Sequence, residues 1–377
     1  MKVLLISRRV NLAQSAPKCN LNLAIALSKI GCEVHILTSH IGSKELKTLK
    51  TYGVSIHIVH PNCASKQIAP ILYTYFARRL KRDMTFILGN GYTLYDDITW
   101  VHFPRLALIK KIQELHLHVP YRLKIEASIE KQIFKTSKIL WAPSKLVARG
   151  LTSLYDVQHR KVICLHHGVD IDYYKPLPRA QREEYRRKLG FDSKFVLLFV
   201  GSDPVLKGLY ILLNEMSNMN NLKDVILLIA GLSSNQELLS RVNKLGLIHN
   251  VRILGFLDTE SLKLYYQLSD GFIIPSLYDA FQLAALEAMA CGAIPIVSRY
   301  AGVSEIVRHG VNGFILDPCR LGCISYVLEE ITSLSSIKLQ AFRNNALSTA
   351  KQCSWFNVAK MLLSKLSISG LFKEILC

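Results

Sequence analysis

The sequence predicts an α/β protein with two parallel sheets, one in each half of the chain. Its 377 residues exceed the length of one ordinary domain, and half of them are hydrophobic, which suffices for two cores. Short Val/Ile/Leu runs alternate with amphipathic helical patterns along most of the chain. Because strands buried on both faces read as continuous apolar runs, we expect each sheet to be covered by helices on both sides.

The first half begins with a strand–helix–strand unit. The apolar run KVLLIS is followed by the amphipathic segment CNLNLAIALSKIG and then by EVHILTS, with Gly31 closing the helix. Further strands are expected, in order, at SIHIVH, MTFILG, DITWVHF, KILWAPS and KVICLHHG.

A charged, proline-bearing segment separates the two halves. DYYKPLPRAQREEYRRKLG, residues 172–190, has no strand pattern and is predicted to be the inter-domain linker. Alternation then restarts with strands at KFVLLFVG, DVILLIAG, VRILGF, GFIIPS, IPIVS and GFILDP, and with helices between them. We place the domains at residues 1–175 and 176–352, followed by a segment 353–377. Ligands bind at the carboxyl ends of parallel strands, so we expect the site in a cleft between the two domains.

Composition limits the possible partners and compartment. The net charge is +19, and residues 1–180 hold 27 basic but only 11 acidic residues, which favours an anionic partner in the first half. The N-terminal MKVLLISRRV is too short for a signal-peptide core, so a cytoplasmic protein is expected. The nine cysteines are scattered, and Cys319 and Cys323 lack a second pair, so reduced thiols are expected and no metal is proposed.

The stretch SLYDAFQLAALEAMACG contains two carboxylates, Asp279 and Glu287, in almost wholly apolar surroundings. One interpretation makes Asp279 a helix N-cap and Glu287 a solvent-facing charge. The neighbours of Glu287 leave little polar surface on the helix, which argues against that. Eight helical residues would separate the carboxylates by roughly 12 Å, too far for a glycosidase pair. The spacing suits a ligand with hydroxyls at both ends and an anion between them, held by the helix N-terminus.

The stretch GSDPVLKG provides a cation for such an anion. A strand ends at Gly201, and Lys207 immediately precedes a helix. An ordinary surface lysine is the alternative, but the helix dipole disfavours a positive charge there, so a bound anion is the better explanation.

These motifs resemble the second domain of the retaining GT-B glycosyltransferases of family 4, which have two Rossmann-like domains. The resemblance rests on GSDPVLKG, VRILGF and PSLYDAFQLAALEAMACGAIPIVSRYAGVSEIVRHGVNGFILDP, and more loosely on HHGVD. GSD…KG is especially similar to the glucosyltransferases of lipopolysaccharide core assembly. The resemblance also implies that SWFNVAKMLLSKL, within residues 353–377, forms a helix packed on the first domain.

The resemblance implies a role for each matching residue. Lys207 would bind the donor diphosphate, Glu287 the ribose hydroxyls and Asp279 the donor sugar, with Lys207 and Asp279 assisting catalysis. Other expected donor contacts are Gly201, Ser202, Gly255, Phe281, Gln282 and Leu283.

The sequence departs from the family at three places. Asp279 stands where the family usually has Glu, Gln14–Ser15 replaces a Gly-Gly turn, and the arginine usually paired with the lysine is absent. A catalytically weakened nucleotide-sugar or glycan-binding protein is therefore the alternative function.

The first domain offers weaker candidates. His102 follows DITWV, where family members often place a histidine that faces the donor sugar; a packed histidine is the alternative. Asp96 and Asp97 are candidates to orient the acceptor hydroxyl, against a solvated loop pair. Asp170 to Asp172 imitate a D-x-D metal motif, which we interpret as coincidence.

Two basic amphipathic stretches, ILYTYFARRLKR and PRLALIKKIQELHLHVPYRLKI, can lie on an anionic membrane. The expected contacts are Lys110, Lys111, Arg122 and Lys124, with a solvated helix face as the alternative. A nucleic-acid-binding protein is favoured only by charge and lacks a recognition motif.

The expected protein is thus a cytoplasmic hexosyltransferase at the inner membrane face. It would transfer a sugar from a nucleotide donor, with a UDP-sugar the first choice, to a lipid-linked or envelope glycan such as lipopolysaccharide core. No cofactor beyond the donor is expected.

Overall fold

The computed structural model describes residues 1–59, 69–219, 222–233 and 236–368. They form two compact units: residues 1–168 with 353–377 make unit 1, and residues 169–352 make unit 2. The division lies seven residues before the boundary expected at 175, because Val169 to Lys175 pack with the second unit; Gln267 Nε2, for example, donates to the Lys175 carbonyl at 2.6 Å.

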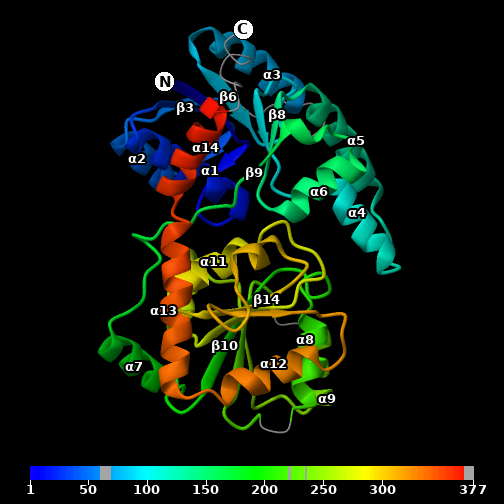
Figure 1. Ribbon diagram of the computed structural model, residues 1–377, viewed down its shortest axis with the longest axis vertical. Coiled ribbons are helices and arrows are strands. Elements are labelled where there is room, and N and C mark those ends of the chain that lie inside the picture. Colours follow the sequence, from blue (N-terminus) through cyan, green and yellow to red (C-terminus); the bar gives the residue numbers. More distant parts are fainter. Residues whose placement is uncertain (60–68, 220–221, 234–235, 369–377) are drawn as a thin grey trace. The chain divides into compact units, whose positions relative to one another are not determined.

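Unit 1 is built on a seven-stranded parallel sheet in the order β5-β3-β1-β6-β7-β8-β9 (Figure 1). Its strands are β1 (Lys2–Ile6), β3 (Glu33–Thr38), β5 (Ser55–Ile58), β6 (Phe86–Gly89), β7 (Ile98–Trp100), β8 (Ile139–Ala142) and β9 (Val162–Cys164). A separate two-stranded ladder joins β2 (Arg9–Val10) to β4 (His40–Ile41). Its helices are α1 (Ser15–Lys29), α2 (Ser43–Thr51), α3 (Ala69–Leu80), α4 (Arg105–Glu114), α5 (Tyr121–Thr136), α6 (Lys145–Leu154) and α14 (Trp355–Ile368), with short 3-10 turns at Lys81–Asp83 and His159–Lys161.

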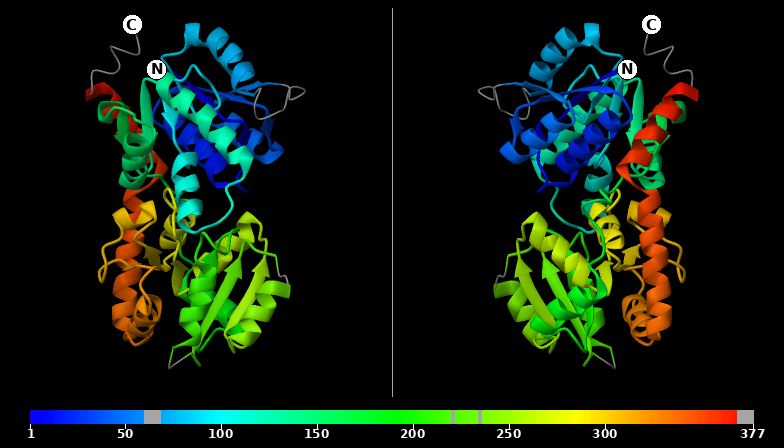
Figure 2. Two further views of the ribbon diagram at one scale, coloured as in Figure 1. Left: turned by 90° about the vertical axis from the view of Figure 1, so that its right-hand side faces the viewer. Right: turned by 90° about the vertical axis from the view of Figure 1, so that its left-hand side faces the viewer.

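The chain returns to unit 1 at its end. Helix α14, red in Figure 2, packs against α1, and Trp355 at its start lies on Trp100 and His167 with ring centroids 5.8 and 6.4 Å away. Buried aromatic contact thus ties the last described helix to the first half of the chain. Residues 369–377 of the expected C-terminal segment lie outside the described residues.

Unit 2 has a six-stranded parallel sheet in the order β12-β11-β10-β13-β14-β15. Its strands are β10 (Phe195–Val200), β11 (Val225–Ala230), β12 (Val251–Gly255), β13 (Gly271–Ile274), β14 (Ile294–Ser298) and β15 (Phe314–Leu316). Its helices are α7 (Arg179–Lys188), α8 (Leu209–Ser217), α9 (Gln236–Lys244), α10 (Thr259–Leu268), α11 (Leu283–Ala290), α12 (Cys323–Thr332) and α13 (Ser336–Gln352), with a 3-10 turn at Gly302–Ile306. Helix α12 packs with α8, and α11 packs with α13 on the opposite side in Figure 1.

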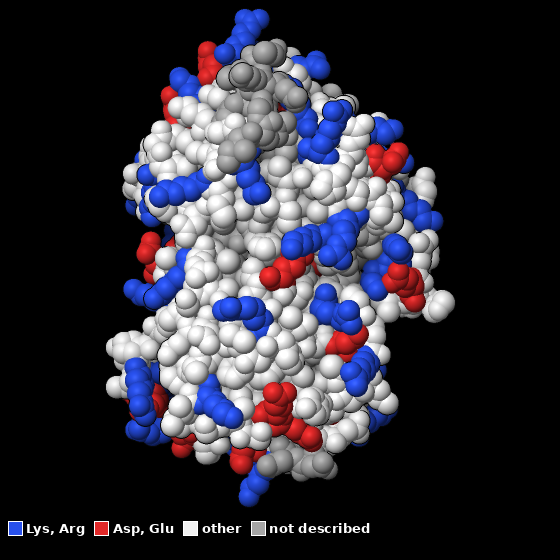
Figure 3. Space-filling model, in the orientation of Figure 1, with Lys and Arg blue, Asp and Glu red and all other residues white. Residues whose placement is uncertain are grey.

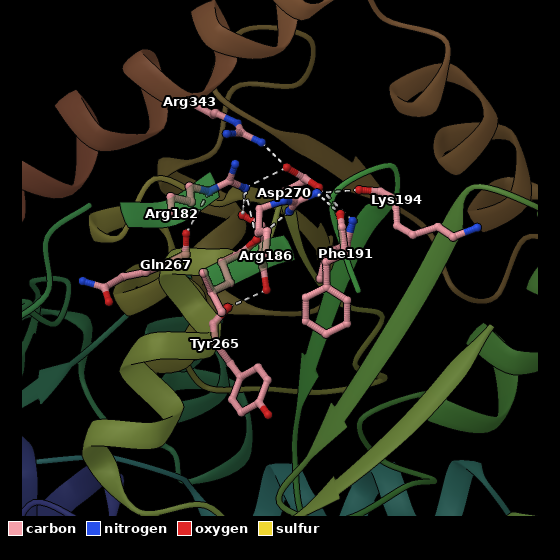
Figure 4. Close-up of polar contacts among 11 residues, drawn as sticks. Arg182, Arg186, Phe191, Lys194, Tyr265, Gln267, Asp270 and Arg343 are labelled. Atoms are coloured by element: carbon pink, nitrogen blue, oxygen red, sulfur yellow. Dashed lines mark hydrogen bonds and ion pairs between the residues drawn. The ribbon is translucent and has the colours of Figure 1, made fainter. Parts of the chain in front are cut away.

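The charged segment expected to be a linker contains a helix that is anchored in unit 2. Arg182 and Arg186 of α7, with Arg343 of α13, surround the buried carboxylate of Asp270 at the start of β13 (Figure 4). Burial acts to raise the pKa of Asp270, but the three guanidinium charges outweigh it and hold the pKa below the ordinary value. The linker interpretation was wrong because Arg182 and Arg186 anchor α7 to a buried carboxylate within unit 2.

Candidate functional site

The unit 2 residues expected to bind a donor lie at the point where its strand order reverses. The neighbours β10 and β13 lead into loops that run in opposite directions across the sheet. In open α/β sheets, ligands bind at this point, beyond the carboxyl ends of the strands. Lys207 follows β10, and Asp279 follows β13.

The loop that carries Lys207 is held tightly. Asp203 Oδ1 accepts from the amides of Val205 and Leu206 at 3.0 and 2.8 Å, so the chain turns sharply after β10. Gly208 has φ of 72°, and a Cβ there would lie 2.1 Å from the Pro275 carbonyl oxygen. Only glycine fits, and the position of Lys207 is fixed by this close approach between the two loops.

Lys207 and Asp279 meet directly. Lys207 Nζ donates to Asp279 Oδ2 and, at 3.4 Å, to Gln282 Oε1. The Asp279 backbone bridges to the loop after β14: its amide donates to the Tyr300 carbonyl at 3.0 Å, and its carbonyl accepts from Gly302 at 3.0 Å. Loops that follow three strands therefore converge on Asp279, which is 7% exposed.

Helix α11 begins later than the sequence suggested. Its first residue is Leu283, and Asp279 is not its N-cap; Asp279 Oδ1 instead accepts from the Phe281 amide at 3.1 Å. The helix starts late because Gln282 has left-handed backbone angles, φ 72° and ψ 71°. The expected 12 Å separation, which assumed eight helical residues, therefore does not apply.

The start of α11 is suited to an anion. It has no side-chain cap and no acidic residue in its first turn, so the positive end of the helix dipole is left for another group. The Phe281 amide already donates to Asp279, and Phe281 itself is 1% exposed. The left-handed backbone conformation of Gln282 costs about 1–3 kcal/mol, and strain of this kind is commonly retained at functional turns.

Glu287 does not face solvent: it is 2% exposed on α11. The Tyr266 hydroxyl donates to Glu287 Oε2 at 3.2 Å, and the Tyr174 hydroxyl also bonds to this carboxylate. Burial, followed by the Glu287 charge, raises the pKa of both phenols, so they remain donors. The two tyrosines were missed from the sequence because they lie outside the motif.

Glycines form the adjoining edge of the sheet. The Gly201 amide donates to the Ala230 carbonyl at 3.0 Å, and the Gly231 amide donates to the Gly255 carbonyl at 2.8 Å. A Cβ on Gly231 would lie 3.0 Å from the Gly201 carbonyl oxygen. Glycines therefore follow β10 and β11 and end β12, and Ser202 beside Gly201 is exposed. A ligand can approach the backbone closely at these three glycines.

Unit 1 contains a pocket of about 570 Å³ at its own strand-order reversal, between β1 and β6. Loops after β1, β6 and β7 supply its wall, together with the start of α1 and one face of α5. Its polar lining residues include Arg8, Arg9, Asn90, His102, Arg105 and Glu130. Of these, sequence analysis selected only His102 as a site residue.

Several groups in this pocket lack a partner among the described residues. Arg8 and Arg9 make no ion pair there, and Asn90 Oδ1 and His102 Nε2 are buried without a hydrogen bond. Burial, then the Arg105 charge, lowers the pKa of His102 to about 3, so its imidazole is neutral. The pocket thus offers positive charge and hydrogen-bonding atoms to an anionic, hydroxyl-bearing molecule.

Asp96 and Asp97 hold the fold together and do not line this pocket. Asp96 accepts from Thr93 and Thr99 at 2.7 and 3.0 Å. Asp97 accepts from the Ile87 amide at 2.8 Å and pairs with Lys81. Burial raises the pKa of Asp96 to about 7, despite its two hydroxyl donors. The solvated-pair interpretation is therefore wrong, since Asp96 and Asp97 are only 5% and 6% exposed, whereas the acceptor role stays a prediction.

The basic residues expected at a membrane lie on the α4–α5 hairpin. Lys110 and Lys124 are exposed, whereas Lys111 pairs with Glu114 and Arg122 pairs with Glu126, at 2.6 and 3.1 Å. Leu117, between the helices, and Tyr121, the first residue of α5, are 46% and 76% exposed.

A second basic surface surrounds α3. A hollow of about 730 Å³ is lined by Ile71, Thr74, Tyr75, Arg78, Arg79, Arg82 and Leu94. Lys and Arg side chains outnumber acidic ones on the face of unit 1 that Figure 3 shows. No helix among the described residues is long and apolar enough to span a bilayer.

Comparison with known proteins places a recognised domain in unit 2. Residues 181–348 match the family model "Glycosyl transferases group 1". The chain is 29% identical over 360 residues to the uncharacterized glycosyltransferase MJ1607 of Methanocaldococcus jannaschii, covering 90% of each. It is 30% identical over 211 residues to a D-inositol 3-phosphate glycosyltransferase of Mycobacterium sp. (strain KMS), covering 54% of this chain and 47% of that one.

Solved structures share the whole fold. Anabaena Alr3699/HepE in complex with UDP and glucose superposes with a TM-score of 0.74 at 17% identity, over 97% of this chain and 99% of that one. WaaG, a glycosyltransferase involved in lipopolysaccharide biosynthesis, gives a TM-score of 0.75 at 16% identity, over 98% and 99%. The two parallel-sheet domains are thus those of the GT-B fold, as the sequence predicted.

Proposed function

We propose that this chain, which carries a glycosyl transferases group 1 domain on a GT-B fold, is a retaining hexosyltransferase of the family 4 type. It transfers a sugar from a nucleotide-sugar donor to a lipid-linked or cell-envelope glycan, such as lipopolysaccharide core. The observation that carries this proposal is the convergence of Lys207, Asp279 and the uncapped start of α11 at the strand-order reversal of unit 2.

The donor diphosphate binds between Lys207 and the start of α11. Without a ligand, the charge of Lys207 is neutralised by Asp279. An incoming diphosphate is a second anion for Lys207 and at the same time interacts with the start of α11. Negative charge develops on the diphosphate as the sugar departs, and a cation and a helix dipole fixed in advance stabilise that charge. The tight turn at Gly208 is the reason that they are already in place.

The remaining donor contacts extend from this centre. Asp279 accepts from hydroxyls of the transferred sugar, and Glu287, supported by Tyr174 and Tyr266, accepts from the ribose. The glycine edge, including Gly201 and Gly255, passes close to the nucleoside. UDP is our first choice of nucleotide, supported by the HepE complexes with UDP and UDP-glucose.

The acceptor side belongs to unit 1. Its pocket, with His102 and the two arginines after β1, provides room and charge for an anionic, hydroxyl-bearing group. The basic α4–α5 hairpin and the α3 surface would hold the enzyme at the cytoplasmic face of an anionic membrane, where a lipid-linked acceptor lies. WaaG supports the choice of lipopolysaccharide core.

The alternative is a nucleotide-sugar-binding protein that has lost turnover. The shorter Asp279 and the glycine-free Gln14–Ser15 turn favour it. A thermal-shift screen of UDP-, ADP- and GDP-sugars, followed by an assay of nucleotide release with candidate acceptors, separates the two. We expect stabilisation by a UDP-sugar and acceptor-dependent release of UDP. Stabilisation without release or donor hydrolysis would favour the binding protein, and no stabilisation by any donor would refute both.

A further inference from the structure

Three side chains able to bind a metal converge inside unit 1. Cys19 lies on α1, His102 follows β7, and His167 follows β9. One ligand atom from each residue lies within 4.8 Å of the other two. The residues are far apart in sequence and form no spacing motif, so no sequence pattern groups them.

The packing around them explains why they meet. Trp100 stacks on Trp141 with ring centroids 4.0 Å apart and planes 1° from parallel. The ring centroid of His102 lies 4.4 Å from that of Trp100, and the ring centroid of His167 lies 5.4 Å from that of His102. A Cβ on Gly168 would lie 2.8 Å from Trp355 Cα, so the chain after His167 is pressed onto the first turn of α14.

The chemistry of the three groups matches a borderline-soft cation. Zinc binds thiolate at about 2.3 Å and imidazole at about 2.0–2.1 Å, which places ligand atoms roughly 3.3–3.8 Å apart. The present limit of 4.8 Å therefore requires the ligand atoms to close by at most about 1.5 Å. The site contains no carboxylate, so it differs from the exposed acidic clusters that are common on protein surfaces.

One ring nitrogen of His102 has a specific need for a partner. His102 Nε2 is buried and has no hydrogen bond, which is unfavourable for a nitrogen removed from water. His102 also lines the 570 Å³ pocket, so an ion can reach the cluster from that side.

We propose that Cys19, His102 and His167 form a Zn²⁺ site in unit 1. With three protein ligands, the fourth position of a tetrahedral ion is left for water. The metal links α1 to the loops after β7 and β9, and it fixes the orientation of His102 in the pocket wall. This proposal does not depend on the proposed transferase function.

The competing explanation is a metal-free cluster of neutral histidines packed on tryptophan. It predicts the same fold and the same buried rings but no stoichiometric uptake of metal. The two explanations are therefore separated by a measurement of metal content and not by activity.

The experiment uses the full-length, untagged chain. After treatment with a chelator, the protein is titrated with Co²⁺, whose bond to a thiolate gives an intense near-ultraviolet charge-transfer band. We expect one equivalent of Co²⁺, displacement by Zn²⁺, and quenching of tryptophan emission, since all three tryptophans lie in this cluster. Failure of the wild-type chain to take up Co²⁺ or Zn²⁺ would overturn the proposal.

Variants identify the ligands. Cys19→Ser should abolish the charge-transfer band, and His102→Gln should lower Zn²⁺ affinity at least about tenfold. Cys319→Ser, which removes an exposed thiol in unit 2, is the matched control and should leave both unchanged. Should Cys19→Ser fail to fold, His102→Gln still decides the assignment. A band lost in Cys319→Ser but retained in Cys19→Ser would place the metal at the surface and refute the site.

Discussion

Replacement of Lys207 by alanine tests the donor site most directly. The change removes the ammonium group that pairs with Asp279, while the carboxylate keeps its bond from the Phe281 amide. A hydrogen bond to a charged group contributes about 1.5–3 kcal/mol, which corresponds to roughly a 10- to 150-fold loss of affinity. Because the Lys207 ammonium interacts with both Asp279 and the diphosphate, we expect a loss of affinity nearer the lower end, about 10- to 50-fold.

Isothermal titration calorimetry with UDP measures this loss without any contribution from the sugar. Lys244→Ala removes an exposed lysine of the same unit and is the matched control. Equal affinity of Lys207→Ala and wild type for UDP, in protein that melts normally, would refute the role given to Lys207.

The ion pair also predicts a change of opposite sign. Asp279→Asn removes a negative charge from beside the diphosphate and frees Lys207, so affinity for UDP should stay the same or rise. Sugar transfer should nevertheless fall, because the carboxylate that accepts from the sugar is gone. A parallel fall in UDP affinity in both variants would mean that Asp279 and Lys207 act only to stabilise the loop.

Three further predictions concern stability and the membrane. Asp270→Asn should destabilise unit 2 by about 3–5 kcal/mol, because it leaves buried guanidinium groups uncompensated, and Cys291 should then label faster with a thiol reagent. The pKa of Asp270 is lower in the folded than in the unfolded state, so its contribution to stability is present above the ordinary carboxyl range and is lost as pH falls through the folded pKa. A difference in stability between wild type and variant that does not shrink as pH is lowered below the ordinary carboxyl range would contradict this. Gly208→Ala should lower both UDP affinity and thermal stability. Gly246 has a similar φ but open space around it, so Gly246→Ala should cost only about 1 kcal/mol of stability. Equal effects of the two substitutions in calorimetry and thermal melting would argue against the close approach at Gly208. Neutralising four basic residues of the α4–α5 hairpin together should release the protein from anionic liposomes in a flotation assay without changing UDP affinity. The four residues are Lys110, Lys111, Arg122 and Lys124. Retained binding would place the membrane surface elsewhere.

The strands were predictable because their residues are buried on both faces. VILLIA in β11 is buried throughout, and such a run has no polar position that could belong to a surface helix. Lys207 and Asp279 were identifiable for a related reason, since each lies in a short loop directly after such a strand and before a helix.

Non-local partners explain the misinterpretations. The charges of Arg182 and Arg186 indicated a solvated linker, yet their carboxylate lies 88 and 84 residues away. Asp96 looked like a solvated acid, but it fits beneath Gly89, where any Cβ would lie 2.2 Å from its carboxylate oxygens. No local pattern reveals either contact.

The two units show why one site could be found from sequence and the other could not. Each places polar groups where its strand order reverses, so topology determines the location in both. In unit 2 those groups belong to two short loops, and each loop ends at a helix start that the sequence marks. In unit 1 they come from several separate segments, and Cys19, His102 and His167 meet only because the tryptophans at positions 100, 141 and 355 pack together. A motif preserves the order of residues along the chain, whereas this cluster depends on core packing, and only coordinates can reveal it.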